Sequence, residues 1–241
     1  DNQKMSASLG NVIYPKDWLQ VAHPELLRMF YNKKIMKTRS FSWQDLPRMY
    51  DDFDNMAKIQ FGEKQLDNKK EVAHTKRLYA ITALDTPRQS LKMSFSHAMM
   101  VAQVFTEEKD IINILEKTNH WEKDKKKEIL ERIHHAITFL DKYVPPASKF
   151  SVQETIPPNL QLEDKQIEAL HRVADILKKE AFNEESLYNE FFNICKDMEL
   201  PPKQLFEAGY KVLLNRERGP KLATLILSIG TEKVIKLFKE V

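Results

Sequence analysis

The chain has 241 residues, of which 38 are basic, 35 are acidic and one is a cysteine. A single cysteine excludes an intramolecular disulfide and a cysteine-based metal site, and the most apolar run, residues 222–229, is too short to cross a membrane. Five glycines, 30% charged residues and strong aliphatic periodicity favour a mainly helical protein. Because nothing in the sequence resembles a signal peptide or a membrane span, we expect a soluble protein of the cytoplasm.

The first dozen residues contain the most distinctive motif, Lys4-Met5-Ser6-Ala7-Ser8, which is followed by Leu9, Gly10 and Asn11. An ammonium group with hydroxyl and backbone donors suits the negative charge that builds on a departing pyrophosphate. Gly10 allows the backbone to take positive φ angles and to pass close to a ligand. The motif is therefore a candidate for phosphate binding, although an exposed tail with common turn residues would show the same letters.

The pattern after this motif predicts a small α/β module. Short helices are expected near residues 17–21 and 24–33, the second beginning at a proline. In residues 37–43, bulky residues alternate loosely with polar ones, which indicates a short strand. A longer helix is expected over residues 45–61, with Gly62 as its C-terminal stop.

The rest of the chain has helical periodicity, so the overall prediction is a mainly α fold. Thr106 and Asn183 are suited to cap the helices that follow them. The longest helix is expected to begin near Trp121. Helices are expected at residues 69–84, 94–105, 106–117, 121–143, 163–179, 184–199, 202–215, 220–229 and 232–240.

Two double prolines, Pro145-Pro146 and Pro157-Pro158, mark the best candidate for a domain junction, because proline disrupts a helix and restricts the residue before it. We therefore expect three regions, residues 1–62, 63–150 and 151–241. Basic residues outnumber acidic ones in the first two regions and not in the third. That distribution is compatible with a polyanion lying along the first two.

Histidine and cysteine give no indication of a metal site. His134 and His135 are adjacent, so on a helix they project about 100° apart and cannot readily share one ion. We interpret one as a surface residue and the other as partly buried. Cys195 falls at helical spacing with apolar neighbours and is interpreted as a buried apolar residue. No metal is predicted.

The KMSAS motif resembles the KMSKS signature loop of class I aminoacyl-tRNA synthetases, with Ala7 in place of the second lysine and Leu9 at a position that is often basic. Further along, four stretches are similar to class I lysyl-tRNA synthetases. These stretches are residues 12–19, 23–31, 45–54 and 205–223. The resemblance thus covers both ends of the chain, with a less distinctive middle.

The resemblance implies that the chain is the C-terminal portion of such an enzyme. Residues 1–62 would hold the signature loop and a stem-contact module, and residues from about 63 onward an all-helical anticodon-binding region, an α-helix cage. The residues that would contact the pyrophosphate of ATP are Lys4, Met5, Ser6, Ala7 and Ser8. The intact enzyme would use ATP with Mg²⁺ to activate lysine and would transfer the lysine to its tRNA for protein synthesis.

Two parts of a class I active site have no counterpart in the sequence. None of the seven histidines lies two residues from a glycine, so a His-x-Gly-His motif is absent, and there is no glycine-rich turn of a nucleotide-binding sheet. We therefore expect the chain alone to bind no ATP and to form no adenylate. The expected partners are lysine tRNA and a missing N-terminal catalytic domain, with no membrane and no DNA.

Basic residues of the predicted stem-contact module lie among Phe30, Tyr31, Phe41 and Trp43. These rings either stack on nucleotides or pack the module's core, and core packing is favoured for Phe30 and Trp43. The lysines are expected to contact phosphates, which positions an RNA without reading its sequence. The candidate tRNA-binding residues of this module are Arg28, Lys33, Lys34, Lys37, Arg39 and Arg48.

Arg216 and Arg218 complete the candidate tRNA-binding set. Together with Lys221 they either contact the anticodon or interact favourably with a helix C-terminus. Two alternatives for the whole chain also stay open. One is the glutamate or methionine enzyme of the same class, and the other is a non-enzymatic helical adaptor that contains the KMSAS letters by chance.

Overall fold

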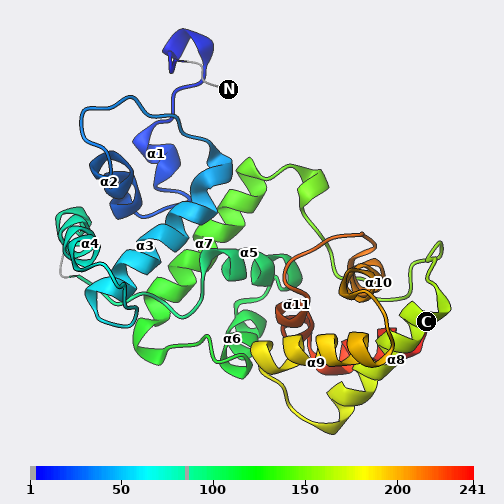
Figure 1. Ribbon diagram of the computed structural model, residues 1–241. Helices are drawn as coiled ribbons and strands as arrows, with labels where there is room; N and C mark the ends of the chain where they lie inside the picture. The colour runs from blue at the N-terminus through cyan, green and yellow to red at the C-terminus, as the bar shows by residue number, and fades with distance from the viewer. Residues whose placement is uncertain (1–3, 85–86) are drawn as a thin grey trace. The chain divides into compact units, whose positions relative to one another are not determined.

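The computed structural model describes residues 4–84 and 87–241, which fall into two compact units (Figure 1). Unit 1 comprises the described residues up to Ala102 together with His120–Pro146, and unit 2 comprises Gln103–Asn119 and Ala147–Val241. The expected division into residues 1–62, 63–150 and 151–241 concerns function and stays a prediction.

Unit 1 contains α2, α3 and α4, which pack on one another, and α7, the longest helix of the described residues. Two further helices and three 3-10 turns complete it, although the last two residues of α5 belong to unit 2. The elements are η1 (Ala7–Leu9), α1 (Pro15–Trp18), α2 (Pro24–Asn32), η2 (Trp43–Asp45), α3 (Leu46–Gln60), α4 (Lys69–Thr82), α5 (Phe95–Val104), η3 (Lys123–Lys125) and α7 (Lys126–Tyr143).

Unit 2 is built around α8, which packs against α9, α10 and α12, while α11 packs against α9. Its core contains the buried Leu170 and Val173 of α8 with Leu237 and Phe238 of α12. The elements are α6 (Glu108–Lys117), α8 (Asp164–Lys179), α9 (Glu184–Asp197), α10 (Pro202–Leu214), α11 (Leu222–Ile229) and α12 (Thr231–Lys239), with the 3-10 turn η4 (Pro146–Ser148) where the chain enters the unit.

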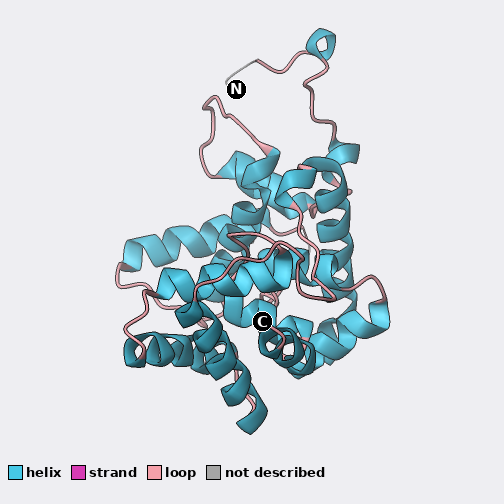
Figure 2. Cartoon of the chain, turned by 90° about the vertical axis from the view of Figure 1, so that its right-hand side faces the viewer, coloured by secondary structure: helices cyan, strands magenta, loops and turns pink. Residues whose placement is uncertain are grey.

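The described part of the chain is helical and contains no strand (Figure 2). The strand predicted for residues 37–43, and with it the small α/β module, is therefore wrong. A strand needs a neighbour to satisfy its backbone groups, and no other extended segment of the described residues pairs with this one. The bulky side chains of residues 37–43 are instead held by aromatic packing. The ring centroid of Phe41 lies 5.4 Å from that of Trp18.

The helical periodicity predicted most helices to within two residues. The helix expected over residues 45–61 is α3 (Leu46–Gln60), and Asn183 caps α9 as predicted, since its side chain accepts a hydrogen bond from the Ser186 N–H at 2.8 Å. Thr106 does not cap α6, because the extended residue before that helix is Glu107.

The helix expected from Trp121 begins only at Lys126. Glu122 is in an extended conformation, and its carboxylate accepts from the Lys92 N–H at 2.8 Å and from the Lys125 ammonium at 2.7 Å. These contacts hold the preceding turn outside the helix.

A buried ion pair joins α3 to α7 within unit 1. Both ends of the Arg132 guanidinium donate to the Asp54 carboxylate, at 2.7 and 2.9 Å, and Arg132 also donates to the Met93 carbonyl at 2.8 Å. Asp54 and Arg132 are 7% and 6% exposed. Two charges this far from water are stable only when paired and hydrogen-bonded, so each holds the other in place.

Tyr50 connects the same core to the turn before α2. Its hydroxyl donates to the Val21 carbonyl at 3.0 Å and lies 3.0 Å from His135 Nδ1, and its ring stacks on Phe95 with centroids 4.0 Å apart. Burial lowers the pKa of His135 to about 4, with the nearby His23 adding to the effect. The neighbouring His134 is exposed, as the sequence predicted for one of this pair.

Candidate nucleic-acid interface

Residues 4–11 form a closed turn at the start of unit 1. The Asn11 side chain spans it, accepting from the Ser6 N–H at 2.7 Å and donating to the Lys4 carbonyl at 3.2 Å. Gly10 has φ of +64° with open space around it, which provides the left-handed conformation that a side chain would disfavour. Sequence reasoning missed Asn11, although asparagine after glycine is a common turn signal.

The hydroxyls of Ser6 and Ser8 lie 2.7 Å apart and hydrogen-bond to each other. Because one hydroxyl proton is used in that bond, the other is available to an incoming acceptor such as a phosphate oxygen. Lys4 and Met5 are exposed. The turn therefore combines an exposed ammonium with a hydroxyl donor, which is the chemistry expected of the motif.

Aromatic side chains gather next to this turn. Trp18 is buried, donates from its indole N–H to the His23 carbonyl at 3.1 Å, and has the rings of Phe41 and Trp43 beside it at 5.4 and 6.1 Å. Trp43 stacks on Tyr143 of α7 at 3.9 Å. The cluster fixes residues 41–43 against the helices of unit 1.

A pocket of about 260 Å³ opens within this aromatic cluster. We call it the aromatic pocket. Five of its nine lining side chains are aromatic, namely Tyr14, Trp18, Phe30, Tyr31 and Phe41, and the others are Met5, Ile13, Pro15 and Leu27.

Two cations lie over rings of the aromatic pocket. The Arg39 guanidinium is 5.1 Å from the Phe30 ring centroid, and the Lys16 ammonium is 5.6 Å from that of Tyr14. Neither Tyr14 nor Lys16 was among the residues predicted from the sequence. Their position in the sequence could have indicated them, since both flank Pro15, the residue that begins α1.

The six basic candidates of this region divide into two groups. Arg28 and Arg39 donate to the carbonyls of Ile81 and Tyr31 at 2.8 and 3.0 Å, and Lys33 pairs with Asp52 at 2.6 Å. The second group, Lys34, Lys37 and Arg48, is exposed. An exposed ion pair such as Lys33–Asp52 contributes at most about 1 kcal/mol to stability. A phosphate could therefore replace the Asp52 carboxylate as the partner of Lys33 at little cost.

Arg216 and Arg218 lie in unit 2, after α10. Arg216 is half-buried and donates to the Ala147 carbonyl at 2.9 Å, while Arg218 is exposed. The turn is compact because Asn215 takes φ of +52° and Gly219 lies where a Cβ would come within 2.8 Å of Tyr210 and Leu214. Arg216 therefore ties the chain before α8 to this turn, and the charge of Arg218 faces solvent.

A larger cleft of unit 1, about 570 Å³, has balanced charge. Four basic and four acidic side chains line it, and the buried Asp54–Arg132 pair is among them. Such a lining gives no preference for a polyanion. The charged lining residues are Glu25, Asp54, Arg88, Lys125, Lys127, Glu128, Glu131 and Arg132.

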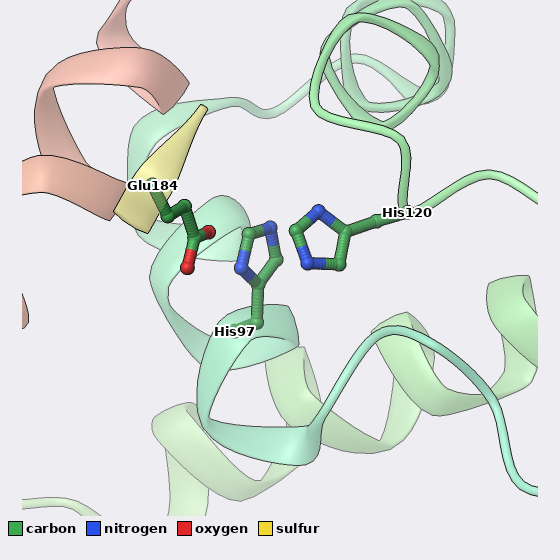
Figure 3. Close-up of side chains that lie close together, drawn as sticks. All are labelled: His97, His120 and Glu184. Atoms are coloured by element: carbon green, nitrogen blue, oxygen red, sulfur yellow. The ribbon is translucent and has the colours of Figure 1, made fainter. Parts of the chain in front are cut away.

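Two histidines of unit 1 form a close pair that the sequence did not predict. His97 of α5 and His120 have ring centroids 4.1 Å apart (Figure 3), and burial, with His120 nearby, lowers the pKa of His97 to about 3. Glu184, also drawn there, belongs to unit 2. Two imidazoles supply fewer ligands than the three or four protein groups of a zinc site, and the absence of a metal stays a prediction.

Cys195 is buried in α9, as predicted, and burial raises the pKa of its thiol. Within residues 4–84 and 87–241, no helix combines the length and apolar character needed to cross a membrane.

Comparison with known proteins gives one consistent result. Residues 1–85 match the family described as "tRNA synthetases class I (K)", a range that contains the closed turn, the aromatic pocket and α1 to α4. Over 97% of its length the chain is 30% identical to the lysine–tRNA ligase of Borreliella burgdorferi and 32% identical to that of Thermococcus kodakarensis. The chain is thus similar to lysine–tRNA ligases over nearly all of its length.

The lysine–tRNA ligase of Pyrococcus horikoshii is similarly 31% identical to the chain over 245 residues. In each of these three comparisons the aligned part is 46% of the relative. The chain thus spans about half the length of the curated relatives that it matches. All of the basic candidates except Arg216 and Arg218 fall in the part that also matches the class I family.

Proposed function

We propose that this chain is the C-terminal, tRNA-binding part of a class I lysine–tRNA ligase and that it supplies the KMSKS-type turn to the active site of the whole enzyme. The observation that carries the proposal is the similarity to lysine–tRNA ligases over 97% of the chain. The charge of the N-terminal region supports it, since residues 4–44 hold seven basic and two acidic side chains.

In the whole enzyme, Lys4 would approach the pyrophosphate of ATP with the hydroxyl donors of Ser6 and Ser8. Mg²⁺, which supplies positive charge to the phosphates, prefers oxygen ligands such as carboxylates. Residues 4–16 contain none, so the metal would be held by ATP and by other parts of the enzyme. Because Ala7 stands at the second lysine position, Lys4 is the one cation of the motif.

The tRNA would lie along the exposed lysines of residues 4–44 through phosphate contacts, with the helical region from about residue 63 onward near the anticodon. Fluorescence anisotropy with lysine tRNA, and with the same transcript carrying a substituted anticodon, tests this arrangement. We expect salt-sensitive binding of both and weaker binding of the substituted transcript. Equal and weak binding of both would reject anticodon discrimination, and binding insensitive to salt would favour the helical adaptor.

We further propose that the chain alone does not activate lysine, since it contains no His-x-Gly-His motif. ATP–pyrophosphate exchange measured with the purified chain, with and without lysine, should stay at background. Lysine-dependent exchange, abolished by Lys4→Ala, would contradict this proposal.

A further inference from the structure

The aromatic pocket is an exposed apolar site that the phosphate contacts above do not use. Tyr14 and Tyr31 are 50% and 60% exposed, whereas Trp18 is buried at the pocket. A water-accessible concentration of aromatic rings on a folded domain marks a binding surface rather than a core. Its volume of about 260 Å³ is below the roughly 300–1,000 Å³ of pockets that enclose drug-sized ligands and suits one small flat ring.

The basic side chains around the aromatic pocket favour a nucleotide over a protein as its ligand. Seven basic and two acidic residues occur in residues 4–44, and two of the cations, Arg39 and Lys16, lie over the Phe30 and Tyr14 rings. A protein-binding surface is usually depleted in lysine at its centre. Aromatic rings flanked by cations are instead the arrangement that holds a single-stranded nucleotide, because the base stacks while its phosphates meet the charges.

We propose that the aromatic pocket binds one unpaired base of an RNA, stacked on Tyr31 and Tyr14, with the flanking phosphates near Lys16 and Arg39, the two cations beside its rings. This inference rests on the proposed function and names the site at which an unpaired tRNA nucleotide is held. Stacking tolerates every base, so the pocket anchors the RNA without reading its sequence.

The test compares two ligands of equal charge, a hexaadenylate RNA and an abasic RNA of the same length, at several salt concentrations with the full chain. The wild type should bind hexaadenylate at least about 5-fold more tightly than the abasic strand, which corresponds to the lower end of measured base–aromatic stacking. Tyr31→Leu and Tyr14→Leu should remove most of that difference and leave abasic binding unchanged. Both side chains are exposed, and leucine keeps an apolar group at each position.

Phe61→Leu is the matched control, because Phe61 is a 40% exposed aromatic residue of unit 1 outside the pocket. It should retain the wild-type preference for bases, as should the conservative Tyr31→Phe. Equal binding of the two RNAs by the wild type, or an unchanged preference in Tyr31→Leu, would overturn the proposal. So would displacement of hexaadenylate by ATP with a steep dependence on Lys4, since the occupant would then be the adenine of ATP.

Two parallel measurements separate this inference from the proposed function. If lysine tRNA binds in a salt-sensitive manner but no base preference is found, the pocket proposal fails and the tRNA-binding role stands. If hexaadenylate is preferred but lysine tRNA is not bound, the proposed function fails and the pocket still binds nucleotides. A concentration-dependent dimer that Tyr31→Leu dissociates would assign the pocket to an interface between copies and overturn the proposal.

Discussion

Two regions of unit 1 differ in where their charged side chains lie and in whether the charges are balanced. In residues 4–44, cations are in excess and several are exposed, and they lie near partly exposed aromatic rings. In α3 and α7, Asp54 and Arg132 are buried and are paired with each other through two hydrogen bonds. Buried charge must be neutralised locally, whereas unbalanced surface charge carries little penalty and attracts a polyanion. The first region is therefore suited to binding and the second to holding the unit together.

The largest expected effect comes from breaking the buried pair. Arg132→Ala leaves the Asp54 carboxylate buried without its partner and should lower the free energy of unfolding by about 3–5 kcal/mol. Arg172→Ala is the control, because Arg172 pairs with Glu168 across an exposed helix turn and should cost at most about 0.5 kcal/mol. Urea denaturation followed by circular dichroism measures both. A similar loss in the two variants would contradict the assignment of a structural role to the buried pair.

The second effect is a loss of stability in mild acid. The pKa values of His97 and His135 are lowered to about 3 and about 4, so below pH 6.5 the unfolded chain binds protons that the folded chain excludes. Stability should fall as pH decreases from about 6.5 toward 4, by up to about 1.4 kcal/mol per pH unit for each histidine. His135→Gln should reduce this slope, and the exposed His134→Gln should leave it unchanged. A stability profile that is flat between pH 7 and 5 would contradict the prediction.

A smaller effect should follow from opening the closed turn of residues 4–11. Asn11→Ala removes the hydrogen bonds to Ser6 and Lys4, each worth about 0.5–1.5 kcal/mol. Global stability should hardly change, because most of the turn is exposed, but hydrogen exchange at the Ser6 amide should become faster. Exchange as slow as in the wild type would show that Asn11 does not close the turn.

Local signals were readable from the sequence, and contacts between distant residues were not. The apolar spacing of residues 46–60 and the cap at Asn183 depend on neighbours a few positions away, and both were predicted correctly. The strand expected at residues 37–43 failed because alternation describes one segment and says nothing about a pairing partner. Nothing in the sequence indicated that Asp54 would meet Arg132, 78 positions later.

The candidate site shows the same contrast between local motifs, which the sequence reveals, and contacts between distant residues, which it does not. The KMSAS motif and the basic residues were identified from the sequence, and the chain's relatives agree with the family that these residues suggested. The aromatic pocket was not foreseen as a pocket, because it forms only when residues 5–18, 27–31 and 41 fold together. The roles of the individual basic residues stay predictions.

The salt dependence of lysine tRNA binding tests the central claim most directly. In the wild type, log K should fall steeply with log salt concentration, and Lys33→Ala combined with Lys34→Ala and Lys37→Ala should reduce the slope by about 0.7–0.9 for each lost phosphate contact. Replacement of the exposed Lys178, Lys179 and Lys203 of unit 2 by alanine removes the same charge outside the region with a basic excess and should leave the slope closer to that of the wild type. An unchanged slope in the first triple variant, or an equal reduction in both, would contradict tRNA binding by the N-terminal region.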